Sequence, residues 1–219
     1  MTLKKTTSRP CSPLHLQRPP LHAPGSAYLY SNLGYIVLGL AAEARGGDSY
    51  RALMGREVFA PLQMAADVGA PDVAHQPLAG HVLGDTGWRP APHTADTRMW
   101  LAMTEAAGGV SLSLREYGRY LREQLKGLDG QSAFLGQTTF ERIHSPLTGY
   151  GHGWGVARDA QLGRVSQHNG SNGNHFSVAL VMRDQRRALA ISCNCYSVKA
   201  VADIETFAGQ LALRASRSK

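Results

Sequence analysis

The sequence has few cysteines and no long apolar run, and each shortage excludes a class of protein. Its 219 residues contain three cysteines, Cys11, Cys193 and Cys195, which form neither the disulfide framework of a small secreted domain nor a four-ligand zinc set. Cys193 and Cys195 fall in a strand-like run, and we interpret them as buried or idle thiols. Because no roughly 18-residue apolar stretch occurs, the sequence predicts no membrane span.

The body of the chain also lacks an excess of positive charge. The formal net charge is +7, but seven cations and no acids lie in residues 1–20 and 211–219, which leaves 16 cations and 16 acids for residues 21–210. A nucleic-acid-binding domain is expected to carry a basic stripe on its folded surface, so we expect no nucleic-acid partner. The first twenty residues contain no apolar segment of a signal peptide, and the composition leaves the compartment unknown.

Composition divides the chain into three parts. The 43% hydrophobic and 18% charged residues are typical of a globular domain, and a chain of this length can bury a core without a disulfide or metal staple. Residues 1–21 are basic and rich in proline, which predicts a disordered arm. We expect the folded domain over residues 22–213 and a basic tail over residues 214–219.

Helical spacing of apolar residues dominates the first part of the domain. It predicts a helix over residues 32–44, which Gly46 and Gly47 end. Ser31 or Asn32 can cap the first turn of this helix.

A second helix is predicted to follow, with Asp48 as its N-cap and a stop at Pro61. Prolines and glycines then break every period over residues 65–109, which indicates a long irregular excursion of functional type. Ser113 and Glu116 form a capping box that opens a third helix.

The pattern changes to strands after Pro146. A hairpin is predicted around residues 184–186, and apolar residues at helical spacing predict a final helix. Because helices and strands come in separate runs, we expect an α+β fold. The expected strands and final helix cover residues 150–157, 164–170, 176–183, 187–194 and 198–213.

Four segments in this order resemble one family. They are the region that begins with Tyr30-Ser31-Asn32, then AAGGVSLSLREYGRYL, YGHGWGV and SQHNGSNGNHFSVALVMRDQRRALAISCN. Residues 22–213 thereby resemble the penicillin-recognising serine hydrolases, which are the class C β-lactamases, D,D-peptidases and related esterases. The resemblance implies an antiparallel sheet with flanking helices and a helical subdomain, as in β-lactamases and penicillin-binding proteins. In it, His168-Asn169-Gly170 takes the place of the family's Lys-Thr-Gly or His-x-Gly motif.

The family's mechanism implies a role for each matched residue. A serine attacks an acyl carbonyl while a lysine and a tyrosine handle the proton. By position, Tyr30 is the catalytic phenol, and its pKa has to be lowered, or its proton shared with a cation, for work near neutrality. The matched substrate-binding residues are Asn32, which would also hold the lysine, His168, Asn169, Gly170 and Ser171, whose amide would be an oxyanion donor. No cofactor is implied.

The family's Ser-x-x-Lys motif has no counterpart before Tyr30. Thr2-Leu3-Lys4-Lys5 begins with threonine in a proline-broken arm, and Ser216-Arg217-Ser218-Lys219 lies at the end of the chain. We therefore expect the nucleophile helix and the N-terminal strands to be missing. The resemblance then predicts a truncated family member with little or no hydrolysis of its own, and apolar faces that favour self-association or need a complementing partner.

Two alternatives stay open. The chain could be a non-catalytic protein that keeps the cleft for a peptide or a small acyl ligand. It could also be a metal hydrolase built on its histidines, although their spacing matches no standard zinc motif. These histidines are His144, His152, His168 and His175.

Overall fold

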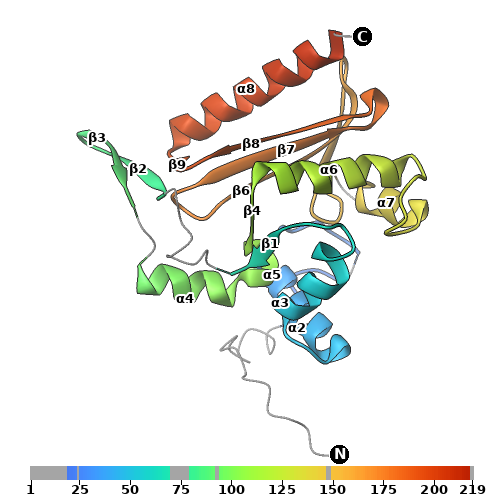
Figure 1. The fold of residues 1–219 in the computed structure, drawn as a ribbon, viewed down its shortest axis with the longest axis horizontal. Helices are drawn as coiled ribbons and strands as arrows, with labels where there is room; N and C mark the ends of the chain where they lie inside the picture. Colours follow the sequence, from blue (N-terminus) through green and yellow to red (C-terminus); the bar gives the residue numbers. More distant parts are fainter. Residues whose placement is uncertain (1–18, 24, 70–78, 92–93, 147–148, 218–219) are drawn as a thin grey trace, which may run out of the picture.

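The computed structural model describes residues 19–23, 25–69, 79–91, 94–146 and 149–217. Its largest sheet lies between one long helix on one face and a helical region on the other (Figure 1). The expected α+β class is therefore confirmed. Among the described residues, no helix is both long and apolar enough to cross a bilayer.

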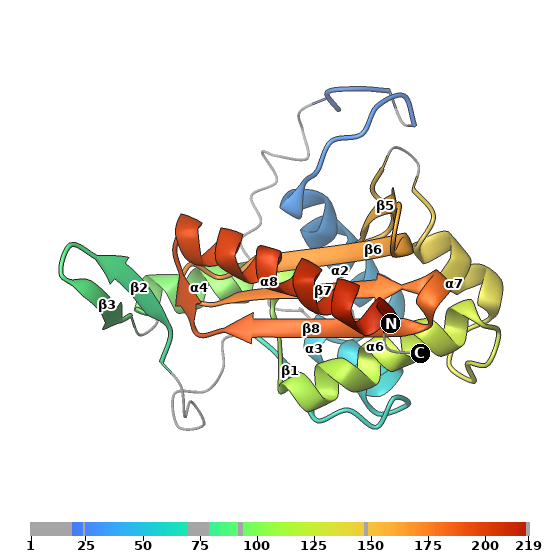
Figure 2. The ribbon, with the colours of Figure 1, turned by 90° about the horizontal axis from the view of Figure 1, so that it is seen from above.

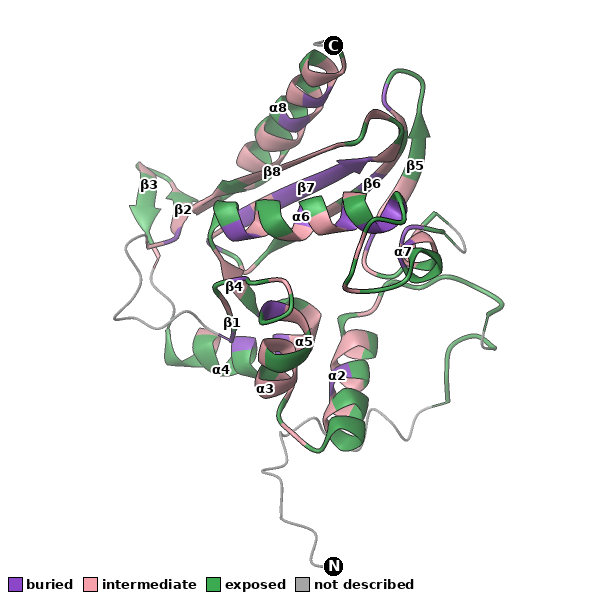
Figure 3. Cartoon of the chain, turned by 45° about the vertical axis from the view of Figure 1, so that its right-hand side comes forward, coloured by how far each residue is buried: buried purple, intermediate pink, exposed green. Residues whose placement is uncertain are grey.

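The main sheet has four antiparallel strands in the order β5-β6-β7-β8. The central strand β7 is almost entirely buried, as Figure 3 shows, because both of its faces are covered. The hairpin expected around residues 184–186 joins β7 to β8 and is confirmed. The strands are β5 (Gly155–Asp159), β6 (Gly163–Ser171), β7 (Phe176–Met182) and β8 (Arg187–Cys193).

Helix α8 (Val198–Arg217) lies across one face of this sheet (Figures 1 and 2). Its Ala208 and Ala212 pack against alternate residues of β7, and the small side chains let the helix approach closely. The helix expected over residues 198–213 is thus confirmed, and it extends through four of the residues expected to form a tail.

The opposite face of the sheet packs on α6 (Leu114–Leu128) and α7 (Gln137–Ile143). The core here contains Leu121, Phe140 and Trp154. Gly127 of α6 lies so close to the ring of Phe140 that any Cβ would collide with it. The sequence pattern missed α7, because seven residues show too little periodicity.

A helical region lies on the far side of α6 from the sheet (Figure 1). Gly39 of the first helix lets it contact Ala106 closely. A small core around Phe59, Met64 and Val68 joins the rest. The elements are α2 (Asn32–Gly46), α3 (Tyr50–Met54), the π-helical turn η1 (Gly55–Phe59), α5 (Glu105–Gly108) and the strand pair β1 (Ala66–Val68) and β4 (Val110–Leu112).

Helix caps explain most of the boundaries. Ser31 caps α2 by accepting from the amide of Gly34, and Gly47, at φ 69°, ends the helix as expected. The second helix is capped by Ser49 rather than Asp48. Ser113 accepts from the amide of Glu116, also as expected.

The capping box itself is incomplete. The carboxylate of Glu116 does not reach back to the cap but accepts from the amide of Ala65, 3.2 Å away. That contact ties the start of α6 to the segment before β1.

The prediction of an irregular stretch over residues 65–109 is wrong for much of its described part. It holds β1, α5, the hairpin β2 (His81–Gly84) and β3 (Gly87–Pro90), and α4 (Ala95–Met103). These elements have three to nine residues, so no period can emerge between the prolines. Thr94 caps α4, and Gly87, at φ 115°, closes the hairpin turn.

The interpretation of Cys193 and Cys195 as idle thiols is wrong, because their sulfurs form a disulfide with 5.2 Å between the Cα atoms. The chain bends at Asn194, between β8 and the short strand β9 (Cys195–Tyr196), and this brings the two sulfurs together. The strand-like pattern of the sequence hid this bend.

Candidate active site

The Tyr-Ser-Asn triplet is both a helix cap and one wall of a hollow. While Ser31 caps α2, the phenol of Tyr30 donates to the carboxamide oxygen of Asn32 at 3.0 Å. Tyr30 lies outside the helix and is 52% exposed. The cap at Ser31 thus fixes the backbone next to Tyr30, from which the phenol projects.

His168 lies on β6 where the pairing with β5 ends, since the last pair joins Gly155 to Gln167. Its Nδ1 lies 2.6 Å from the carbonyl oxygen of Gly153. A carbonyl oxygen only accepts, so Nδ1 carries the proton. Nε2 is then left for other interactions.

Trp154 holds His168 from the core side. The edge of one ring meets the face of the other, with 6.2 Å between the centroids. Trp154 also contacts the ring of His144, with 5.1 Å between the centroids. The buried indole therefore fixes the orientation of the imidazole that reaches the hollow.

His144 belongs to a buried polar network that the sequence did not reveal. Its Nδ1 lies 2.8 Å from the hydroxyl of Ser166 and its Nε2 lies 3.1 Å from the amide oxygen of Gln124. Burial, together with the nearby Arg183, lowers the pKa of His144 to about 4. This imidazole is therefore neutral near pH 7, and it packs against the ring of Trp154.

A hollow of about 470 Å³ joins these parts. Tyr30 and His168 both line it, so the structure places these two predicted residues at one cavity. No serine, threonine, cysteine or lysine occurs among the described residues that line it. The other lining residues are Gly149, Tyr150, Gly155, Val156, Ala157, Val165, Gln167 and Asn169.

Tyr150 is a wall residue that sequence reasoning did not single out, although it opens the quoted segment YGHGWGV. Its ring contacts those of Tyr28, at 5.4 Å, and Tyr30, at 5.8 Å. Burial and the neighbouring phenols, Tyr35 first, raise the pKa of Tyr150 well above its usual range. Tyr150 is thus a neutral hydrogen-bonding group near pH 7 and not a base.

The remaining predicted residues lie at the margin. The carboxamide of Asn169 donates to Glu205 of α8 at 2.7 Å, on the opposite face of the sheet from His168. At Gly170, no other atom lies within 4 Å of the position that a Cβ would take. The hydroxyl of Ser171 donates to the carbonyl of His175 at 2.7 Å. Asn169 also lines the hollow, whereas Asn32, Gly170 and Ser171 do not.

The four histidines of the metal alternative have separate partners. Those of His144 and His168 are given above, while His152 contacts the carbonyl of Arg142 and His175 the side chain of Asn174. Within the described ranges, no three His, Cys, Asp or Glu residues gather closely enough to hold a metal ion.

Comparison with known proteins supplies the family. Residues 15–212 match the model of the Beta-lactamase family. The resemblance predicted from four short segments is therefore confirmed over nearly the whole chain.

Solved structures agree in fold. SurE matches with a TM-score of 0.73 at 22% identity, over 91% of this chain and 48% of its own. An octameric penicillin-binding protein homologue from Pyrococcus abyssi gives 0.68 at 20% identity, over 86% and 44%. A D-amino acid amidase from Ochrobactrum anthropi SV3, complexed with L-phenylalanine amide, gives 0.61 at 20% identity, over 77% and 50%. This chain spans about half the length of these structures.

Proposed function

Since the chain belongs to the beta-lactamase family, we propose that the hollow between Tyr30 and His168 is part of an acyl-hydrolase site and that the chain alone turns over little or no substrate. The substrates of that site would be esters, β-lactams or D-alanyl peptides. The observation that carries the proposal is the lining of the hollow, which offers a phenol and an imidazole but, among the described residues, no serine, threonine, cysteine or lysine.

The groups that are present suit an acyl substrate. The phenol of Tyr30, already donating to Asn32, can redirect its proton to a leaving group. His168, whose Nδ1 donates to the carbonyl of Gly153, presents Nε2 as an acceptor for an N–H or O–H group of the substrate. Binding and hydrogen bonding without a nucleophile leave only about 10³- to 10⁴-fold acceleration over water in serine hydrolases that have lost their triad.

Ligand-induced stabilisation tests whether the hollow binds such molecules. A β-lactam or a D-alanyl-D-alanine peptide at about 100 times its Kd should raise the stability by about 2.7 kcal/mol, and thus the Tm. His168→Ala should abolish the shift, whereas Lys199→Ala, at an exposed position on α8, should keep it. Equal shifts in both variants would place the binding elsewhere.

The second candidate function is a ligand-binding protein that performs no chemistry. The absence of a nucleophile among the described lining residues favours it equally. Two measurements separate the candidates: a melting shift with no product favours binding alone, while product formation after adding the Ser-x-x-Lys part of a relative favours a hydrolase that needs a complement.

We also propose that the chain self-associates or binds such a complement along β8. Among the described residues, β8 pairs only with β7. A second hollow, of about 320 Å³, runs beside it and is lined by both α6 and consecutive residues of β8. An uncovered strand edge with apolar walls is a surface that proteins usually protect. The octameric state of the Pyrococcus abyssi homologue supports the proposal.

A further inference from the structure

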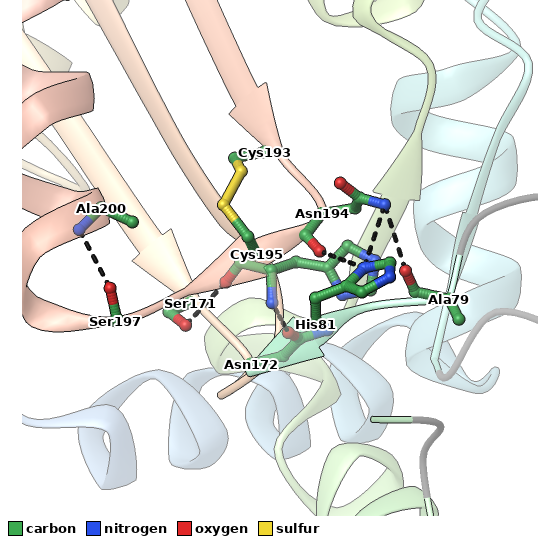
Figure 4. The surroundings of a disulfide bond; sticks show 10 residues. Ala79, His81, Ser171, Asn172, Cys193, Asn194, Cys195, Ser197 and Ala200 are labelled. Carbon is green, nitrogen blue, oxygen red and sulfur yellow. Dashed lines mark hydrogen bonds between the residues drawn. A yellow bond between two sulfur atoms is a disulfide. The ribbon is translucent and has the colours of Figure 1, made fainter. Parts of the chain in front are cut away.

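The disulfide lies where the main sheet meets the β2–β3 hairpin (Figure 4). Cys193 is the last residue of β8, Cys195 is the first of β9, and only Asn194 separates them. Both cysteines are partly exposed. Thiols in solution can therefore reach them while the protein stays folded.

This disulfide contributes little to the stability of the whole domain. A cross-link stabilises mainly by restricting the unfolded chain, and the effect grows with the length of the closed loop. Here the two cysteines are only two positions apart. Its effect is therefore local, on the bend that it encloses.

Asn194, the enclosed residue, anchors strand β2. Its carbonyl oxygen accepts from the backbone amide of His81 at 2.8 Å and from Nδ1 of the same residue at 3.1 Å. Its carboxamide donates to the carbonyl of Ala79 at 3.2 Å. Next to it, Cys195 pairs in parallel with His81. The bend thus supplies the contacts that join the hairpin to the end of β8.

The same hairpin also rests on the turn that follows β6. The amide of His81 is shared, because it donates to the carbonyl of Asn174 as well, at 3.1 Å. Asn174 donates from its carboxamide to Ala91, and Gly80 lies too close to it for any side chain. This turn begins at Ser171, whose hydroxyl accepts from the amide of Gly173 at 3.0 Å.

We propose that Cys193–Cys195 is a thiol-exchange site for small thiols, and that its reduction loosens the β2–β3 hairpin and the turn 171–175. A thiolate attacks one sulfur, the S–S bond breaks, and a mixed disulfide forms. A second thiolate of the reductant then displaces the cysteine thiolate. The protein gains two electrons and two protons as two thiols, and the reductant leaves as its own disulfide.

Loosening follows from the shared hydrogen bonds. Once the bend opens, Asn194 is no longer fixed opposite His81, and the contacts of Asn174 with His81 and Ala91 have to carry more of the hairpin's attachment. Asn174 belongs to the turn after β6, which begins at Ser171. Movement of the hairpin is therefore passed to Ser171, at the margin of the candidate site. The proposal does not depend on the acyl chemistry.

Hydrogen exchange of the full chain tests the proposal, in a Cys11→Ser background so that only the pair reacts. Oxidised protein should take up no iodoacetamide, and protein reduced with dithiothreitol should take up two labels without unfolding. On reduction, amides in 81–84, 173–175 and 194–196 should exchange at least about tenfold faster, while those of β7 stay protected. Cys193→Ser/Cys195→Ser should show the fast exchange with or without dithiothreitol.

Three results would overturn the proposal. The first is labelling of untreated protein by iodoacetamide, which would mean that the disulfide is absent. The second is reduction that occurs only after urea unfolds the domain, which would make the bond inaccessible. The third is unchanged exchange in all three segments after complete reduction, which would show that the bond holds nothing in place.

Discussion

The indole of Trp154 contacts two imidazoles, with its ring centroid 5.1 Å from that of His144 and 6.2 Å from that of His168. One of these histidines is buried in a polar network, and the other lines the candidate site. The core and the site are therefore joined through one side chain. Substitutions of Trp154, His144 or His168 should therefore affect both stability and binding.

We expect Trp154→Ala to lower the free energy of unfolding by about 3–5 kcal/mol, because the indole is only 4% exposed and its loss leaves a cavity. Trp88→Ala is the matched control, since Trp88 is 47% exposed on β3, and it should change stability by less than about 1 kcal/mol. Urea unfolding followed by circular dichroism measures both. Equal losses in the two variants would refute the packing described here.

The pKa of His144 predicts a loss of stability in acid. Its folded pKa, about 4, lies below the unfolded value of about 6.5, so the unfolded chain takes up this proton first as the pH falls. The loss begins near pH 6.5, grows to about 3 kcal/mol at pH 4 and then levels off.

His144→Gln removes this titration, while acids elsewhere titrate in both proteins. The wild type should therefore lose about 3 kcal/mol more than the variant between pH 6.5 and 4, in urea unfolding at each pH. Parallel pH profiles would show that His144 is not buried in its neutral form.

Two glycines of α6 should respond in opposite ways to alanine. Gly127→Ala forces a methyl group into the ring of Phe140 and should cost about 1–3 kcal/mol. Gly118→Ala meets nothing within 4 Å, so the gain in helix propensity should stabilise the protein by about 0.5–1 kcal/mol. Thermal unfolding of both variants suffices. A stabilising Gly127→Ala would contradict the contact between α6 and α7.

Self-association through the β8 edge predicts a concentration-dependent mass in light scattering. Leu114, which is 52% exposed, lines the hollow beside β8. Leu114→Lys should place a charge there and shift the protein toward monomer. Leu38→Lys, at an exposed site on α2 away from β8, should not. A monomeric wild type at all concentrations would rule out this surface as a self-association site.

The elements predictable from the sequence were those with a long period or a clear cap. The helix after Ser31 has fifteen residues and a glycine stop, and the strands β7 and β8 have a short, polar turn between them. The hairpin β2–β3 and helices α4 and α7 were missed because their residues are too few to show a period.

The site was predictable only as far as a motif reached. Tyr30 and His168 were named from the family resemblance, and the structure places both at one hollow. Tyr150 was not named and His144 was named only for the metal alternative, because their roles depend on contacts between residues far apart in the sequence. The bond between Cys193 and Cys195 depends on a bend that strand-like residues conceal.

Intact-mass spectrometry after incubation with a fluorophosphonate or a β-lactam shows whether the acyl site contains a nucleophile. If the walls of the acyl site are present without its nucleophile, the mass of the protein stays unchanged at full reagent excess, while an active-site serine hydrolase run in parallel gains one adduct. A stoichiometric adduct on any serine of this chain would show that the protein has its own nucleophile.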